Sequence, residues 1–367
     1  MLGNARVFGP AYLDRILRVD SSLLGEGAPP IDQSMGGRPR FIDCPGLTLI
    51  DREGSALDLQ LPDDWPGPRG AVELERLLAL EPAATNFLRG ESWADELGGM
   101  GAGIAAATGA ELVTALGPPD DPASAAIEGL LGEKGVAARI VRRDRPADWT
   151  LVVSSGAYCD TLAIGFRDCL QSLTADDLAP FLAEPTDVRI VAALPNRLAA
   201  EALKAPGARL RVFAPAMRNA IDRDRPILDL IEPVDVLCCN HLEWEATADR
   251  EEVAARLSIL VVTEGPAGST ARFADPSGSA RSIRVPAFPR SRPPRDTVRA
   301  GEAFVSFFLG TLIARGWRSE SCVAEPELIR EAMTRASAAA ALTLDLGGFG
   351  FPTPERVDAA VARGVVD

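Results

Sequence analysis

The stretch DTVRAGEAF, at residues 296–304, puts a carboxylate where a helix begins. The residues that follow, 303–313, are nearly all apolar, which predicts a buried helix that starts beside Ala300 and Gly301. The first turn of a helix has unpaired backbone N–H groups and the positive end of the helix dipole, so it can hold an anionic phosphoryl group. Glu302 would then stand within reach of that group. Acidic residues are also common in first turns because of the dipole alone, and this simpler interpretation stays open.

The composition excludes several other kinds of chemistry. The chain has 52 acidic and 38 basic side chains and a net charge of −14, so it would repel nucleic-acid backbones and anionic membranes. Lys134 and Lys204 are the only lysines, and neither follows a glycine as a P-loop requires. With His241 as the single histidine, most metal sites and catalytic triads are ruled out. None of the six cysteines forms a Cys-x-x-Cys pair, so we expect free thiols and a cytoplasmic protein.

The elements that must position Glu302 alternate along the chain. Short apolar runs predict strands, and alanine- and leucine-rich stretches predict helices, which is typical of an α/β fold around a mostly parallel sheet. The predicted strands are 6–8, 111–116, 150–154, 188–192, 209–214, 234–239 and 259–263. The predicted helices are 123–133, 175–182, 198–203, 251–257, 302–315 and 327–342.

Residues 20–66 break this pattern. They are rich in Gly, Pro and Asp and contain short alternating pieces, which predict small antiparallel strands and turns. A helix is expected over 71–80. We therefore expect an α/β domain formed by 1–19 and 67–367, with 20–66 as a β-rich lid.

Three glycines, Gly99, Gly101 and Gly103, suggest a dinucleotide-binding turn, which must follow a strand and open a helix. Their spacing does not fit G-x-G-x-x-G, and the preceding ESWADEL does not read as a strand. A dehydrogenase is therefore not expected.

Several segments resemble the motifs of one family, in the family's order. DTVRAGEAF is similar to the C-terminal signature of the ribokinase-like (PfkB) carbohydrate kinases, Asp-Thr-x-Gly-Ala-Gly-Asp-x-Phe. The other matching segments are RVFGPAYLD at 6–14, GGMGAGIAAATGA at 98–110, LGPPDDP at 116–122, NHLE at 240–243, TEGPAG at 263–268, and FPTPERVDAAV near the C-terminus. The resemblance implies a ribokinase-like three-layer sandwich, with a mostly parallel central sheet flanked by helices and a small β-rich lid.

The resemblance also implies the roles of particular residues. It makes Glu302 the catalytic base and gives an anion hole to Arg299, Ala300 and Gly301. The implied substrate contacts are Asp14, Gly98, Gly99 and Gly103, and the implied ATP contacts are Asn240, Thr263, Gly265 and Gly268. It places Mg²⁺ near Glu243, through water, and a monovalent cation such as K⁺ near Asp296 and Val298. From the residues alone, Asn240 and Glu243 could equally cap a helix, and the segment 263–268 could equally be a hairpin turn.

The chain departs from the family at the catalytic residues themselves. Glu302 replaces an aspartate, Arg299 replaces a glycine, Gly103 replaces an asparagine, and Met100 stands where some members have lysine. Two functions are therefore expected as alternatives. The first is an ATP-dependent kinase for a hydroxyl of a sugar, polyol or nucleoside. The second is a catalytically impaired homologue that binds a sugar or nucleoside as a sensor or structural subunit. The resemblance further implies a homodimer paired through the lid and a small-molecule substrate, and the negative net charge argues against a nucleic-acid or membrane partner.

Overall fold

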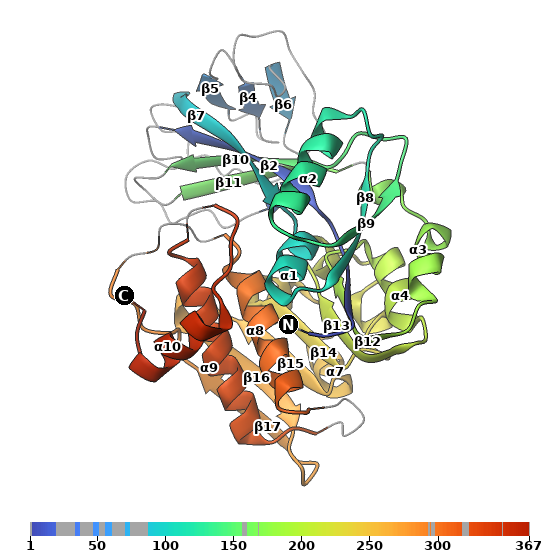
Figure 1. The fold of residues 1–367 in the computed structure, drawn as a ribbon, viewed down its shortest axis with the longest axis vertical. Coiled ribbons are helices and arrows are strands. Elements are labelled where there is room, and N and C mark those ends of the chain that lie inside the picture. The colour runs from blue at the N-terminus through green and yellow to red at the C-terminus, as the bar shows by residue number, and fades with distance from the viewer. Residues whose placement is uncertain are drawn as a thin grey trace.

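The computed structural model describes residues 2–19, 34–36, 47–50, 56–60, 70–73, 87–155, 160–167, 169–292, 294, 298–317, 323–346 and 348–366. These residues form two sheets, and helices cover both faces of the larger one. Figure 1 shows the smaller sheet at one end of the α/β body. Among the described helices, none has the length and apolar character needed to cross a membrane.

The central sheet contains nine described strands in the order β17-β16-β15-β14-β13-β12-β1-β8-β9. Neighbours from β15 to β9 are parallel, and β16 and β17 extend one edge antiparallel. The bounds are β1 (Ala5–Phe8), β8 (Glu111–Leu116), β9 (Ala138–Arg142), β12 (Thr186–Ala192), β13 (Ala208–Ala214), β14 (Val236–Asn240), β15 (Ile259–Thr263), β16 (Ser269–Ala274) and β17 (Ala280–Val285). This arrangement confirms the predicted mostly parallel sheet.

Successive residues of the central strands enter two different cores. In β1, Val7 packs on one side of the sheet and Phe8 on the other, and both are fully buried. Ile190 and Val191 divide in the same way in β12. Because helices bury both faces, these strands read in the sequence as continuous apolar runs, which is why they could be located there.

The helices form the outer two layers. One core is shared by α1, α2, α8 and α9, and the other by α3, α4, α6 and α7, while α10 packs on α9. The α-helical bounds are α1 (Met100–Thr108), α2 (Pro122–Glu133), α3 (Ala175–Leu182), α4 (Asn196–Lys204), α5 (Met217–Ala220), α6 (His241–Ala246), α7 (Arg250–Arg256), α8 (Ala300–Ala314), α9 (Pro326–Thr343) and α10 (Pro354–Arg363). Short 3-10 turns are η1 (Leu170–Ser172), η2 (Ile227–Asp229) and η3 (Gly265–Ala267).

The second sheet has the strand order β3-β11-β10-β2-β7-β5-β4-β6 within the described residues. Its bounds are β2 (Tyr12–Val19), β3 (Ser34–Gly36), β4 (Leu47–Ile50), β5 (Ala56–Gln60), β6 (Gly70–Glu73), β7 (Phe87–Gly98), β10 (Trp149–Ser155) and β11 (Asp160–Phe166). It therefore takes strands from well outside 20–66. That residues 20–66 form a unit of their own stays a prediction.

Three local predictions need correction. The strand predicted over 150–154 forms, but as β10 it belongs to the second sheet and not to the central one. The helix expected over 71–80 is wrong at its start, because 71–73 lie in β6, which pairs with β4; residues 74–80 lie outside the described residues. ESWADEL is part of β7, so a strand does precede α1, and only the glycine spacing still argues against a dinucleotide-binding turn.

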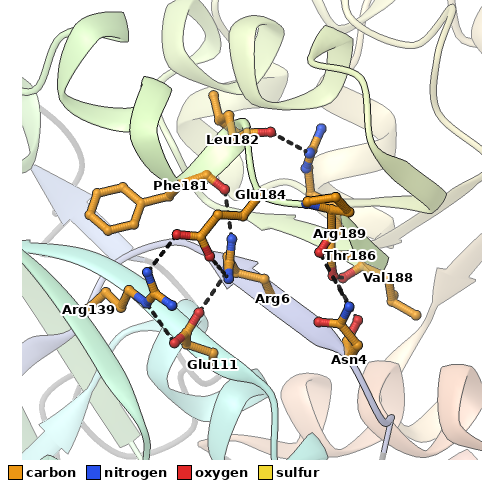
Figure 2. Close-up of polar contacts among 11 residues, drawn as sticks. Asn4, Arg6, Glu111, Arg139, Phe181, Leu182, Glu184, Thr186, Val188 and Arg189 are labelled. Atoms are coloured by element: carbon orange, nitrogen blue, oxygen red, sulfur yellow. Dashed lines mark hydrogen bonds and ion pairs between the residues drawn. The ribbon is translucent and has the colours of Figure 1, made fainter.

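A network of ion pairs joins the amino-terminal ends of β1 and β8 to the segment after α3. Figure 2 shows Arg6 and Arg139 bridged by two carboxylates. Arg6 lies 2.7 Å from both Glu111 and Glu184, and Arg139 lies 2.8 Å from both. These ion pairs hold β1, β8 and β9 to the segment after α3, at the end of the sheet opposite the carboxyl ends of its strands.

Arg189, in the middle of β12, is fully buried. Its guanidinium donates to the backbone carbonyls of Leu182, Ala202, Ala205 and Pro206, at the carboxyl ends of α3 and α4. Burial, together with the charges of arginines in β13 and β1, lowers its pKa to about 10. The carbonyls carry the negative end of each helix dipole, which offsets part of the cost of the buried charge.

Candidate active site

The start of α8 is set by a residue in an unusual conformation. Arg299, the N-cap, has φ of 70°, in the left-handed region that favours glycine. Ala300 and Gly301 follow in the first turn, where N–H groups have no intrahelical acceptor. A Cβ built on Gly301 would meet nothing within 4 Å, so this turn is open. Binding of an anion at this turn stays a prediction.

Glu302, in the same turn, leans against α1. A Cβ built on Gly103 would lie 2.9 Å from its Cγ and 3.6 Å from its Cδ. Burial raises the pKa of Glu302, and the nearby charge of Asp14 raises it further, whereas its own backbone N–H and the charge of Arg299 lower it. The net direction is upward, which makes Glu302 a stronger base than an exposed glutamate.

Asp14 lies in β2 of the second sheet and faces the loop that enters α1. Its carboxylate lies against the backbone of Gly98, where a built Cβ would come within 2.1 Å of Oδ2. Burial raises the pKa of Asp14; a hydrogen bond with Thr150 and the charges of Arg167 and Arg299 oppose this rise. A glycine is required at position 98 because any side chain there would displace the carboxylate.

The Asp14 carboxylate belongs to one row across the second sheet. Asp14 is paired with Glu96 of β7 on one side and Thr150 of β10 on the other, and Thr150 is paired with Gly165 of β11. Residues paired across neighbouring strands point to the same face. The guanidinium of Arg167 lies over Gly165, donates to Thr150 Oγ1 at 2.9 Å, and stacks 3.7 Å from the ring centre of Tyr12.

Arg299 joins this row to α8. Its side chain, 5% exposed, lies 2.6 Å from Glu96, which is 19% exposed. It also donates to the carbonyl of Gly348 at 3.2 Å and lies 5.3 Å from the ring centre of Phe349. In the structure its guanidinium is held by Glu96 and Gly348, toward the second sheet.

A second group of predicted residues lies at the carboxyl ends of β14 and β15. Asn240 Oδ1 accepts from the N–H of Glu243, and Glu243 accepts from the N–H of Asn240, both at 2.9 Å. These residues thus form a capping box at the start of α6. Asn240 is paired with Thr263 across the strands, so the two motifs lie side by side.

The segment after Thr263 is a hairpin between antiparallel β15 and β16. Gly265 has φ of 56° with nothing near a built Cβ, whereas Gly268 has φ of 101° and a built Cβ would lie 2.2 Å from the carbonyl oxygen of Val285. Gly268 is therefore demanded by close backbone packing, as in an ordinary turn. An ATP contact there stays a prediction.

Asp14 packs on Gly98, Glu302 packs on Gly103, and the charges of Asp14, Arg299 and Glu302 act on one another, so five of the predicted residues form one cluster, which we call the α1 cluster: Asp14, Gly98, Gly103, Arg299 and Glu302. Gly99, with φ of 92°, forms the turn between β7 and α1. Val298 is 38% exposed, just before the cluster, and Asp296 lies outside the described residues. Across the described parts of the chain, no group of three or more His, Cys, Asp or Glu side chains could hold a metal ion by itself.

Sequence reasoning missed Glu96, Thr150 and Arg167, which complete the polar surroundings of Asp14. Glu96 lies in a polar strand, and Thr150 and Arg167 lie far from it in the sequence, so no local motif marks these three residues. The available signal was ESWADEL, whose alternate residues could have been read as one face of a strand.

Comparison with known proteins gives the fold and the family. Three solved structures superpose over nearly all of this chain. Ribokinase from Giardia lamblia has a TM-score of 0.65 at 17% identity, with 99% of each chain covered. A nucleoside kinase of the ribokinase family from Methanocaldococcus jannaschii has a TM-score of 0.63 at 15% identity, with 98% of each chain covered. Ribokinase from Arabidopsis thaliana, complexed with ribose and ATP, has a TM-score of 0.61 at 17% identity, covering 98% of this chain and 99% of that one. The predicted ribokinase-like fold is confirmed.

The sequence comparisons agree. A probable chloroplastic fructokinase, fructokinase-6 of Arabidopsis thaliana, is 30% identical over 173 residues, which are 44% of this chain and 41% of that protein. This chain thus matches less than half of that relative's length. The model of the pfkB family of carbohydrate kinases matches residues 81–356, which include Glu302, Asn240 and Gly103. The chain therefore belongs to the pfkB family of carbohydrate kinases.

Proposed function

We propose that this protein transfers the γ-phosphoryl group of ATP to a hydroxyl group of a sugar or related polyol. The observation that carries the proposal is the α1 cluster, in which two carboxylates bracket the start of α1. Asp14 lies against Gly98 just before the helix, and Glu302 lies against Gly103 in its first turns. One carboxylate can bind substrate hydroxyls while the other accepts a proton.

The reaction follows from these positions. Glu302 takes the proton of the acceptor hydroxyl as its oxygen attacks the γ-phosphorus of ATP. The new oxygen–phosphorus bond forms while the bond to the ADP oxygen breaks, and ADP leaves with the electron pair. The N–H groups of Ala300 and Gly301, at the positive end of α8, would stabilise the negative charge of the transferred group. Arg299 would act indirectly, because it holds Glu96 in an ion pair and forms the N-cap of α8.

The groups around Asp14 favour a ligand with several hydroxyls. Glu96 and Asp14 accept hydrogen bonds, Arg167 donates them, and the hydroxyl of Thr150 can do both. Each hydroxyl of a polyol can both donate and accept a hydrogen bond, so it can pair with any of these groups. The fructokinase relative supports a sugar substrate, and the Burkholderia thailandensis nucleoside kinase solved with inosine, a fold neighbour with a TM-score of 0.63, keeps nucleosides in the assay panel.

The nucleotide would lie toward the carboxyl ends of β14 and β15. Asn240 and Thr263 are adjacent there, beside the open turn at Gly265. Glu243 is 7% exposed, and its carboxylate lies at the start of α6, where it accepts from the N–H of Asn240. A single acid that acts through water would fit the preference of Mg²⁺ for keeping its waters. When bound, Mg²⁺ supplies positive charge to the triphosphate.

A second function is supported by a specific observation. Arg299 replaces the glycine of the motif at φ of 70°, and Glu302 is one methylene longer than aspartate. A displacement of about 1 Å at a reacting group can cost about 100-fold in rate. A homologue that binds a sugar or nucleoside without turnover, as a sensor or structural subunit, is therefore the alternative.

The test is ADP formation by the purified protein with Mg-ATP against a panel of sugars, sugar phosphates and nucleosides. Glu302→Gln is the matched control, because it keeps the shape of the side chain and removes the base. ADP formation that depends on an acceptor and falls about 10²–10⁴-fold in the control supports the kinase. Acceptor binding measured by calorimetry without ADP formation supports the alternative. Absence of both binding and turnover across the panel would contradict both functions.

The homodimer, the monovalent cation near Asp296 and Val298, and the cytoplasmic location stay predictions. Sedimentation velocity tests the first, and the dependence of the rate on K⁺ tests the second. Fluorescence microscopy of the tagged protein tests the third.

A further inference from the structure

Helix α1 contains two glycines in its interior, and each requires an explanation. A glycine in the middle of a helix is less favourable than alanine by roughly 1 kcal/mol. At Gly101 the explanation is backbone packing, since a built Cβ would lie 2.6 Å from the carbonyl carbon of Gly9. At Gly103 the nearest atoms all belong to one side chain, that of Glu302. Gly103 is therefore not explained by backbone packing.

We propose that Gly103 is a positioning residue for the base, because its missing side chain is the space in which the Glu302 side chain lies. This inference rests on the proposed function for its catalytic consequence, but not for its structural one. The residue was expected to contact substrate. That contact stays a prediction; in the structure, the side chain of Glu302 lies against Gly103.

The distances show what any side chain at position 103 would do. A Cβ there would stand 2.9 Å from Cγ and 3.3 Å from Cβ of Glu302, closer than ordinary van der Waals contact. Turning Glu302 about its first side-chain bond relieves the contact with Cγ, whereas the 3.3 Å contact between the two Cβ atoms is relieved only if α1 and α8 move slightly apart. Either change displaces the Glu302 carboxylate. The two departures from the family motif, at positions 103 and 302, are thus physically coupled.

The structural half of the proposal is tested by melting temperatures, without any substrate. Gly129→Ala is the matched control, since Gly129 is also inside a helix, α2, and a Cβ there would meet nothing within 4 Å. With an unfolding entropy of about 2.1 cal/mol/K per residue, the control should raise Tm by about 1 °C. Replacing Glu302 by alanine removes the 2.9 Å contact with Cγ and keeps the 3.3 Å contact with Cβ, so Gly103→Ala should be tolerated better in that background than with Glu302 present. With Glu302 present, overpacking should make the Tm change caused by Gly103→Ala about 1–4 °C more negative than in the Glu302→Ala background.

The catalytic half is tested by the kinetics of Gly103→Ala. Displacement of the base predicts a fall in kcat of about 100-fold, with KM for ATP within about 2-fold of wild type. The control Gly129→Ala should keep the wild-type rate. Circular dichroism checks whether Gly103→Ala is folded. If this variant is unfolded, the variant with both Gly103→Ala and Glu302→Ala still shows whether removing the glutamate restores stability.

Equal Tm changes for Gly103→Ala with and without Glu302, together with an unchanged kcat, would overturn the inference. If no acceptor supports turnover in any variant but the Tm changes still depend on Glu302, the proposed function fails while the packing relation holds. The two failures are therefore distinguishable.

Discussion

The replacement of Arg299 by glycine tests how the second sheet is held against α8. Two effects of opposite sign are expected. Removing the arginine leaves Glu96, which is 19% exposed, without its ion-pair partner, at a cost of about 3–5 kcal/mol. Glycine is also better suited than arginine to φ of 70°, which recovers about 1 kcal/mol. The net destabilisation is about 2–4 kcal/mol.

This loss can be measured as a melting temperature. For 367 residues, an unfolding entropy of about 2.1 cal/mol/K per residue gives about 0.8 kcal/mol per degree, so Tm should fall by about 3–5 °C. Arg299→Ala is the control for backbone strain. It loses the same ion pair but keeps a Cβ at positive φ, so its Tm should lie about 1 °C below that of Arg299→Gly.

A double-mutant cycle with Glu96→Gln isolates the ion pair itself. If Arg299 and Glu96 stabilise one another, Arg299→Gly should cost less in the Glu96→Gln background, by about 1–3 kcal/mol. Additive effects of the two substitutions, or an Arg299→Gly protein as stable as wild type, would refute the reasoning. The pair would then contribute no stability despite its 2.6 Å separation.

Three further predictions follow from the titration and burial of single residues. Because burial raises the pKa of Glu302, the pKa of the acid limb of kcat/KM should lie above the ordinary glutamate value. This pKa should rise further in Arg299→Gly, which removes a charge that lowers it. A pH–rate profile of both proteins checks the two expectations. The folded state holds the Glu302 proton more tightly than the unfolded state, so wild type loses stability as pH rises from the unfolded to the folded pKa. Glu302→Gln should therefore melt above wild type by a margin that grows through that window and then levels off, and a constant margin in melting curves from pH 4 to 8 would contradict this. Arg189→Met should destabilise the fold by about 2–4 kcal/mol in urea unfolding, because backbone carbonyls at the ends of α3 and α4 lose their donor; an unchanged midpoint would show that water replaces the guanidinium.

The strands and helices of the central layers were accessible from the sequence because their signals are local. Glu111–Leu116 and Ile259–Thr263 are strands with the predicted bounds, since both faces of each strand are buried and most residues of each run are apolar. The second sheet was predicted only in part: β4 and β5 are antiparallel strands within 20–66, as expected, whereas β2, β7 and β11 were not predicted. In β2 and β7, charged residues such as Arg15 and Asp95 interrupt the apolar pattern. These two side chains form an ion pair across the strands, and that pairing is not visible in either segment alone.

The sequence by itself determined which residues could do chemistry. DTVRAGEAF marked Glu302 and the helix start, and the ordered motifs marked Asp14, Asn240 and the family. These signals were readable because each depends on a few neighbouring residues, a helix start or a strand followed by a turn.

Only the tertiary structure decided what surrounds those residues. Glu96 and Arg299 are 203 positions apart, yet their side chains form one buried ion pair. The meeting depends on the strand register of the second sheet, and the contact between Gly103 and Glu302 depends on how closely α1 packs on α8. Neither is a property of any short segment, because register and packing distance are set by the whole set of elements folding together.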